Sequence, residues 1–381
     1  MTNRPLKKNP LLKMLNETLI DLPAPSNLSY MWNMGSILSM CLIVQVLSGL
    51  LLASVYSPSM DMSFFCTNWL METNDKGWLL RYLHSNGASM FFMALYTHTG
   101  RNIYYNSFYM KKTWNIGIIM LVLVMATAFM GYVLPLNQMS FWGASVITNL
   151  FSEIPYIGPK VVLTIWGDMS VSEPTITRFF TFHFLLPFVT LSMLVVHITM
   201  LHQTGSSNPT GLNSNPDKIL FNKYFSIKDL AGLSFVIFFY LYVTLIAPLI
   251  TGDNDNFVPA NPLTTPTHIQ PEWYFLFAYA ILRSIPSKLG GILALTGSIL
   301  ILFLPPLFNA PLMKSKAFYP LAKMLFWLLT MNLILLSWLG ARPVEAPFLS
   351  LSQIFTAAYF INFVLNPLTS YLWDKYFMKP V

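Results

Sequence analysis

Long apolar segments alternate with shorter polar ones along almost the whole chain. Eight of them are long enough to cross about 30 Å of hydrocarbon, which takes about 20 helical residues. They cover residues 33–54, 78–104, 114–134, 175–202, 229–249, 289–309, 321–341 and 349–372. Two longer connections, 135–174 and 250–288, contain turn-rich and short helical pieces. The pattern predicts an all-α membrane protein with eight transmembrane helices.

Composition and charge support this prediction. Of the 381 residues, 55% are hydrophobic and 10% are charged, whereas soluble domains carry about 25% charged residues. With eight spans, both termini lie on one side, and that side holds 15 of the 22 lysines and arginines. The positive-inside rule then places both termini on the cytoplasmic or matrix face. This distribution accounts for the net charge of +7 without a nucleic-acid partner.

Four of the six histidines form two pairs with one spacing. His84 and His98 are 14 residues apart on the second predicted span, and His183 and His197 are 14 apart on the fourth. Fourteen helical residues turn about 1400°, about 40° short of four full turns, and rise about 21 Å. Each pair therefore lies near one helix face. Because both spans run in the same direction, we expect His84 opposite His183 at one depth and His98 opposite His197 at another.

Opposed imidazoles at two depths can supply two bis-histidine iron sites. Haem iron takes nitrogen axial ligands, and flat macrocycles fit between the helices of a bundle. The alternative is a set of scattered polar residues in a bundle core, but ionisable residues inside a membrane are functional candidates. The equal spacings favour haem. We therefore predict a four-helix di-haem bundle within residues 1–210, followed by a C-terminal region of four further spans, 211–381.

Glycines repeat the same step. Gly35 and Gly49 are 14 residues apart on the first predicted span, and Gly117 and Gly131 are 14 apart on the third. Glycine has no Cβ and permits close approach of a porphyrin edge to the backbone. Small residues are also common where membrane helices pack against each other. The shared step favours a haem cage of four helices.

Two arginines lie three positions from a predicted ligand. Arg81 precedes His84, and Arg101 follows His98. Each lies near a span end, where a guanidinium would pair well with a haem propionate. The alternative is an arginine that extends to the membrane interface.

Several motifs resemble the cytochrome b family in its mitochondrial form. They are Pro271-Glu272-Trp273-Tyr274, Phe141-Trp142-Gly143-Ala144, His84-Ser85-Asn86-Gly87-Ala88-Ser89 and the two histidine pairs. The resemblance covers nearly the whole chain. One departure is Leu136-Asn137, where most relatives have Trp-Gly, so the local shape of the neighbouring quinol-pocket wall does not carry over.

The resemblance implies a subunit of ubiquinol–cytochrome c reductase (respiratory complex III) in the mitochondrial inner membrane, with both termini in the matrix. It implies a low-potential b-type haem on His84 and His183 and a high-potential one on His98 and His197. Ubiquinol would be oxidised on the intermembrane-space side and ubiquinone reduced on the matrix side, which generates a proton gradient. The implied partners are a Rieske iron–sulfur subunit, a cytochrome c-type haem subunit, a second copy of the chain and membrane lipid. Two cysteines, Cys41 in a span and Cys66 in a loop, are too few for an iron–sulfur cluster within this chain.

The resemblance also implies two quinone sites. Quinol oxidation would involve Phe129, Tyr132, Gly143, Pro271, Glu272, Phe275 and Tyr279, and quinone reduction would involve His202, Ser206, Lys228 and Asp229. Quinol oxidation releases protons, and burial would raise the pKa of Glu272 into a useful range, although a solvated loop glutamate is the alternative.

Some residues near these sites can be interpreted without a catalytic role. His202 suits a proton donor, whereas Asp229 could be a helix N-cap. His268 receives no catalytic role; we expect a satisfied loop histidine or a contact with a partner subunit.

Two other functions fit parts of this pattern. A different di-haem membrane oxidoreductase, such as a ferric reductase, would share the ligands but lack quinone pockets. A transporter that relays protons through histidines would contain no haem. The combined motifs favour the quinone-linked enzyme.

Overall fold

The structure is a computed structural model, and it describes residues 9, 12–13 and 16–378. Arg4, Lys7, Lys8 and Lys379, which contribute to the predicted charge asymmetry, lie outside the described residues.

Among the described residues, six helices are long and apolar enough to cross a membrane. They are α2 (Met34–Ala53, entered through the 3-10 turn Tyr30–Asn33), α5 (Lys111–Val133), α8 (Glu173–Thr204), α9 (Phe221–Ile246), α12 (Pro320–Gly340) and α13 (Phe348–Phe377). Each coincides with a predicted span within a few residues, except that α9 begins eight residues before its predicted start. The chain is therefore an all-α membrane protein, apart from one very short sheet.

The other two predicted spans differ from these six. Residues 78–104 form one continuous helix, α4 (Gly77–Tyr104), which is less apolar because it carries the histidines and arginines singled out above. Residues 289–309 do not form one helix. They are divided into α11 (Lys288–Leu300) and the 3-10 turns Ile301–Phe303 and Pro305–Leu307. Pro305 and Pro306 lack the N–H that a continuing α-helix needs, so the prediction of a single long helix here is wrong.

The connections hold short elements. Residues 135–174 contain α6 (Gln138–Asn149), the 3-10 turn Leu150–Glu153 and α7 (Gly158–Trp166); residues 250–288 contain the 3-10 turns Asn254–Phe257 and Trp273–Phe275 and α10 (Leu276–Ser284). An unpredicted helix, α3 (Met62–Thr73), follows α2. Cys66 lies on this helix and not in a loop as predicted. The remaining elements are the π-helix Asn16–Ile20, the 3-10 turns Ser107–Tyr109 and Lys316–Phe318, and the strands β1 (Pro23–Pro25) and β2 (Lys218–Leu220).

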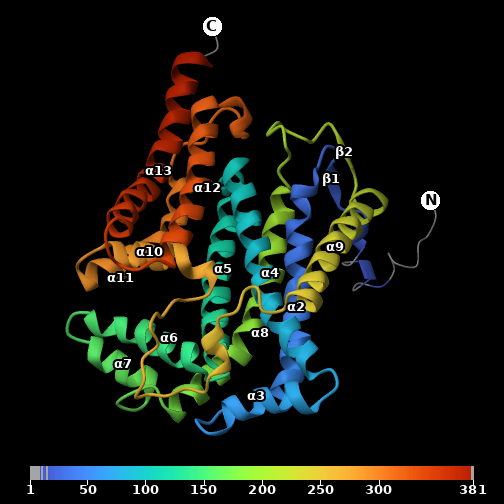
Figure 1. Cartoon of the computed structure of the whole chain (residues 1–381). Helices are drawn as coiled ribbons and strands as arrows, with labels where there is room; N and C mark the ends of the chain where they lie inside the picture. The colour runs from blue at the N-terminus through green and yellow to red at the C-terminus, as the bar shows by residue number, and fades with distance from the viewer. Residues whose placement is uncertain (1–8, 10–11, 14–15, 379–381) are drawn as a thin grey trace.

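The long helices run lengthwise between two ends of the molecule, and the shorter α10 and α11 lie across them (Figure 1). Helices α3, α6 and α7 lie at one end, whereas β1 and β2 pair antiparallel at the other, with Ala24 opposite Ile219. Helix α2 packs along α4, and α5 packs along α8. Helices α10, α12 and α13 form a second group, whose core also contacts α4 and α5. This arrangement places α4 between α2 and α9, and α8 against α5, so that the faces of α4 and α8 that carry the paired histidines turn inward.

Candidate functional site

His84 of α4 and His183 of α8 face each other in the interior. Their ring centroids are 6.1 Å apart, and the rings are nearly perpendicular at 82°. The Nδ1 atom of His84 lies 2.9 Å from the Ser48 hydroxyl, and Nδ1 of His183 lies 2.8 Å from the Thr127 carbonyl oxygen. A hydrogen bond at Nδ1 fixes the ring and its tautomer and leaves Nε2 for another ligand.

The residues of this pair fit a haem. A metal–nitrogen bond of about 2 Å on each side, with about 1 Å from nitrogen to ring centre, separates two axial imidazole centres by about 6 Å. Among the described residues, three or more His, Cys, Asp or Glu side chains nowhere gather to hold a bare metal ion. Two lone imidazoles suit a metal whose other ligands come with it, as in a porphyrin.

Three of the four singled-out glycines lie against predicted ligands. A Cβ added at Gly49 would lie 3.1 Å from Cε1 of His84, and one at Gly117 would lie 3.3 Å from Cε1 of His197. A Cβ at Gly131 would overlap the His183 ring, whereas Gly35 has no atom within 4 Å of its Cβ position. The missing Cβ therefore makes room for an imidazole, where the sequence argument assigned that space to a porphyrin edge.

The second histidine pair lies deeper along the same two helices. His98 and His197 are close enough to interact electrostatically. An Nη atom of Arg101 lies 3.3 Å from Nδ1 of His98, and the guanidinium stacks 5.0 Å above the Trp32 ring. Arg101 is only 9% exposed, and its Nε has no hydrogen-bond partner within the described part of the chain. A buried guanidinium with an unused donor suits an anionic group such as a propionate.

A cavity extends from the His84–His183 pair to Tyr132 and Glu272, and Arg81 and Asn256 also line it. Burial raises the pKa of Glu272 to about 7; the Arg81 guanidinium opposes this rise, and the Asp253 carboxylate adds to it. Glu272 can therefore exchange a proton near neutral pH. The pocket thus joins a metal-binding pair to an acid–base group.

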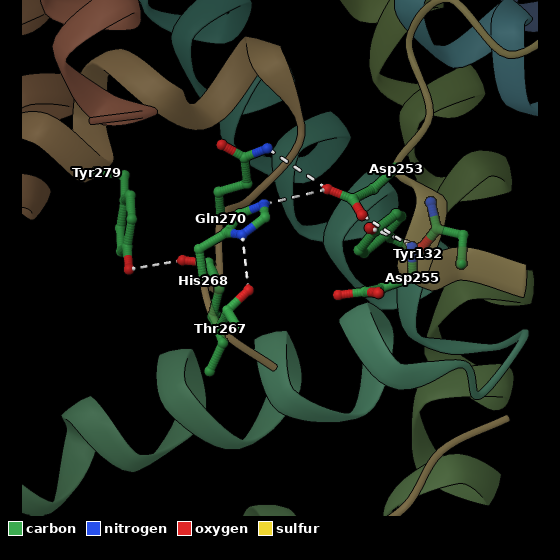
Figure 2. A network of polar contacts seen from close by, with 9 residues as sticks. Tyr132, Asp253, Asp255, Thr267, His268, Gln270 and Tyr279 are labelled. Atoms are coloured by element: carbon green, nitrogen blue, oxygen red, sulfur yellow. Dashed lines mark hydrogen bonds and ion pairs between the residues drawn. The ribbon is translucent and has the colours of Figure 1, made fainter. Parts of the chain in front are cut away.

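A row of polar side chains leads away from this cavity (Figure 2). The Tyr132 hydroxyl donates to Oδ1 of Asn256 at 3.1 Å and also lies beside Glu272, but its single proton serves one acceptor at a time. Asp253 receives a hydrogen bond of 3.5 Å from the Gln270 amide. It also lies 3.9 Å from Nε2 of His268, whose side chain is 63% exposed.

Sequence reasoning missed Asn256 and Asp253. An amide and a carboxylate in a polar loop carry no pattern that separates them from ordinary solvated turn residues. His268 is a loop histidine paired with Asp253, in line with its plainer reading.

The other predicted quinol-site residues lie outside the cavity lining that Tyr132 and Glu272 share. They are Phe129, Gly143, Pro271, Phe275 and Tyr279. Phe129 packs on Phe179 with ring centroids 5.9 Å apart. The Tyr279 hydroxyl donates to the Ile269 carbonyl at 3.2 Å, as Figure 2 shows. The structure therefore brings together two of the seven residues around one cavity and does not place the other five in its lining.

The unusual pair Leu136-Asn137 has a structural role. Leu136 is buried and adopts a left-handed backbone conformation with φ of 48°. Oδ1 of Asn137 accepts a hydrogen bond of 2.9 Å from the Ser140 N–H and so caps α6. Asn137 also pairs with Pro259 in an isolated β-bridge. The departure therefore fastens the start of α6 to the 250–275 connection.

Lys228 and Asp229 gather with the start of α2. The Asn33 side-chain amide donates to the Lys228 carbonyl at 2.8 Å, and the Ser36 hydroxyl lies next to the Asp229 carboxylate. Asp229 lies inside α9, whose regular part resumes after the non-helical residue Lys223. The N-cap alternative for Asp229 is therefore wrong.

His202 and Ser206 lie at and just beyond the C-terminal end of α8. Sequence reasoning missed Asn33 and Ser36 near Lys228 and Asp229, because both read as ordinary residues at a helix start. The predicted quinone-reduction residues thus occupy two helix ends.

Comparisons with known proteins agree along the chain. The family described as "Cytochrome b/b6/petB" matches residues 19–205, and "Cytochrome b(C-terminal)/b6/petD" matches residues 259–360. A solved structure titled "Hyperthermophilic respiratory Complex III" contains a chain that is 28% identical, with a TM-score of 0.90. The alignment covers 96% of this chain and 98% of that one.

Proposed function

Because the chain belongs to the cytochrome b family, we propose that it is the cytochrome b subunit of a quinol–cytochrome c reductase, respiratory complex III. We place it in the mitochondrial inner membrane with both termini in the matrix. In this proposal α4 and the segment from α11 to Pro305–Leu307 cross the membrane with the six longer helices. Its partners are a Rieske iron–sulfur subunit, a cytochrome c-type subunit, a second copy of the chain and membrane lipid.

Two b-type haems, when bound, would supply one-electron redox chemistry. His84 and His183 would hold one iron, and His98 and His197 the other. Ser48 and Thr127 orient the first pair through their contacts with Nδ1. Arg81 and Arg101 would pair with propionates, which the unused donor of Arg101 supports.

Ubiquinol oxidation belongs in the cavity between the first histidine pair and Glu272. Glu272 is buried, carries a pKa of about 7 and can take a proton from a quinol hydroxyl. Tyr132 holds or releases a hydrogen bond to this carboxylate by turning between Asn256 and Glu272. Asp253 and His268 continue the polar row toward the surface.

Ubiquinone reduction belongs at the other end of the helices. His202, at the end of α8, would donate a proton, and Asp229 and Lys228 would position the quinone together with Ser206. The support is a set of buried and half-buried polar groups, Asn33, Ser36 and Asp229, in an otherwise apolar helix region.

A ferric reductase of the same ligand set is the second candidate. Reduction of ferric iron transfers electrons only and does not require an acid–base group beside the His84–His183 pair. The shared cavity of His84, His183, Tyr132 and Glu272 therefore favours the quinone-linked reaction.

The single observation that carries the proposal is the 6.1 Å separation of the His84 and His183 rings. Its test is a reduced-minus-oxidised absorption spectrum of the intact complex. We expect His183→Ala and His197→Ala each to lose a different one of two haem components, whereas His268→Ala keeps both. Two unchanged components in both variants would reject the ligand assignment. Haems that ubiquinol cannot reduce in the wild-type complex would reject the quinone-linked function in favour of the ferric reductase.

A further inference from the structure

Lys316 is a buried lysine in the 3-10 turn that precedes α12, and it is only 2% exposed. Its Nζ donates to Oδ1 of Asn106 and to Oδ1 of Asn366, each at 2.7 Å. The Phe108 ring lies 5.8 Å from the same nitrogen. The amine therefore joins three segments: the α4–α5 connection, the turn before α12, and α13.

This buried amine has no counter-charge among the described residues, and both of its hydrogen-bond partners are neutral amides. A buried ammonium without a carboxylate is costly, and burial lowers the pKa of Lys316 to about 7. Part of the cost is offset by the end of α4, because the C-terminal end of a helix carries a partial negative charge. Such a group is poorly explained as a source of stability alone.

The partner Asn106 has an unusual backbone. It has φ of 50° and ψ of 33° and follows directly after Tyr105, the residue that caps α4. Residues other than glycine adopt this left-handed conformation at a cost, although asparagine tolerates it better than most. The hydrogen bond from Lys316 to Oδ1 holds Asn106 in this conformation.

The next residue links this turn to the proposed quinone-reduction site. The Ser107 hydroxyl lies 2.9 Å from the Ser207 hydroxyl, and Ser207 follows Ser206 in the sequence. Because a peptide bond joins Asn106 to Ser107, the backbone conformation of Asn106 determines where Ser107 contacts the segment after α8.

We propose that Lys316 is a positioning residue for quinone reduction, which holds Asn106 at the end of α4 and so keeps Ser107 against Ser207 beside Ser206. This inference rests on the proposed function of the site at Ser206. The amine touches no predicted substrate residue and acts only through Asn106.

The test compares Lys316→Met with Lys314→Met in the intact complex. Each variant removes one positive charge, and the two positions are two residues apart, but Lys314 is exposed whereas Lys316 is buried. We expect amide hydrogen exchange in residues 105–109 to become several-fold faster in Lys316→Met and to stay unchanged in Lys314→Met. The KM for ubiquinone reduction should rise several-fold in Lys316→Met, while the rate of the quinol-oxidation step stays the same.

A second substitution separates positioning from general damage. Glycine adopts the left-handed conformation without a side-chain support, so adding Asn106→Gly to Lys316→Met should restore both the exchange rate and the KM. If Lys316→Met alone does not accumulate, accumulation of the double variant supports the proposal. A double variant that stays impaired or fails to accumulate overturns it.

Other results bear on the two proposals differently. If amide exchange in residues 105–109 is equal in the two single variants, or is faster in Lys316→Met with an unchanged KM, the positioning role of Lys316 is rejected. The proposed function of the protein is not affected by that result. Absence of quinone-dependent haem reoxidation in the wild type rejects the proposed function, and the role of Lys316 with it.

Discussion

Glu272 owes its acid–base character to neighbours that lie far from it in the sequence. Burial raises its pKa, Arg81 on α4 opposes the rise, and Asp253, earlier in the same connection, reinforces it. The Tyr132 hydroxyl, at the end of α5, can donate to this carboxylate or to Oδ1 of Asn256. The chemistry of this residue is therefore set by residues of two helices and of its own connection, and each can be changed separately.

Substitution of Glu272 by Gln tests its proton role. Only the ionised carboxylate accepts a proton, so with a pKa of about 7 quinol oxidation should accelerate as pH rises from 6 to 8. Glu272→Gln should slow this step by about 100-fold or more and remove that pH dependence, while Glu345→Gln in an exposed loop retains it. Rates are measured by stopped-flow haem reduction. The same rise with pH in Glu272→Gln would contradict the assignment.

Substitution of Asp253 by Asn tests the local field. Removal of a negative charge eases ionisation of Glu272, so the midpoint of the same pH profile should move to lower pH, by less than about one unit. Asparagine retains the Oδ1 that accepts from the Asp255 N–H at 2.9 Å, so the turn should persist. A midpoint that moves upward would show that Asp253 does not act through its charge.

Sequence reasoning reached these residues unevenly. Glu272 and Tyr132 could be named from the motifs that contain them, and the histidine pairs from their spacing. Asp253, Asn256, Asn33 and Ser36 could not, because their roles depend on which loop meets which helix end, and that contact leaves no periodic signal in the sequence.

At the scale of elements, the close approach of α5 and α8 fixes the position of one proposed haem ligand. Gly131 on α5 faces the His183 ring of α8 so closely that a Cβ would overlap it. Gly35, on the other hand, faces open space. Glycines with the same spacing therefore carry different constraints.

The close contact of Gly131 with the His183 ring can be tested with a matched pair of variants. Gly131→Ala should displace His183, since a methyl group has no room beside the imidazole. It should therefore remove or strongly shift the spectral component assigned to the haem on His84 and His183. Gly297→Ala on α11, where an added Cβ would lie 3.7 Å from the Phe360 ring, should leave both components unchanged. Low-temperature absorption and electron paramagnetic resonance spectra report axial ligation directly. An unaltered spectrum in Gly131→Ala would contradict the packing seen here.

The helices themselves were largely predictable. Six long apolar stretches became six long helices because a membrane span must satisfy every backbone group within itself. The failure at 289–309 came from hydropathy alone, which does not register that Pro305 and Pro306 break the hydrogen-bond ladder. Helix α3 was missed because it is short and shows no strong separation of polar and apolar faces.

The whole molecule presents apolar side chains on its outside. Phe235 and Phe238 of α9, for example, are 72% and 70% exposed. Such a surface is stable against lipid or another apolar subunit and not against water. The exposed belt on the long helices thus agrees with the composition from which the membrane assignment began.

A charge placed on this belt should hinder assembly. An aspartate near the middle of a span costs about 2.5–3.5 kcal/mol on insertion scales, so Phe238→Asp should lower the amount of protein recovered from alkali-washed membranes several-fold. Tyr156→Asp, at a fully exposed position between α6 and α7, should accumulate normally. Quantitative immunoblots of the washed membranes measure both. Equal recovery would place Phe238 in an aqueous or protein-lined environment.

The pocket bounded by His84 and His183 on one wall and by Glu272 and Tyr132 on another has a consequence for inhibition. In the proposed reaction, a quinol bound in this pocket gives up its electron and its proton from one position, so no strongly charged intermediate has to move through the apolar interior. An inhibitor that only separates these two walls would therefore stop electron transfer and proton transfer together, even with every named side chain intact.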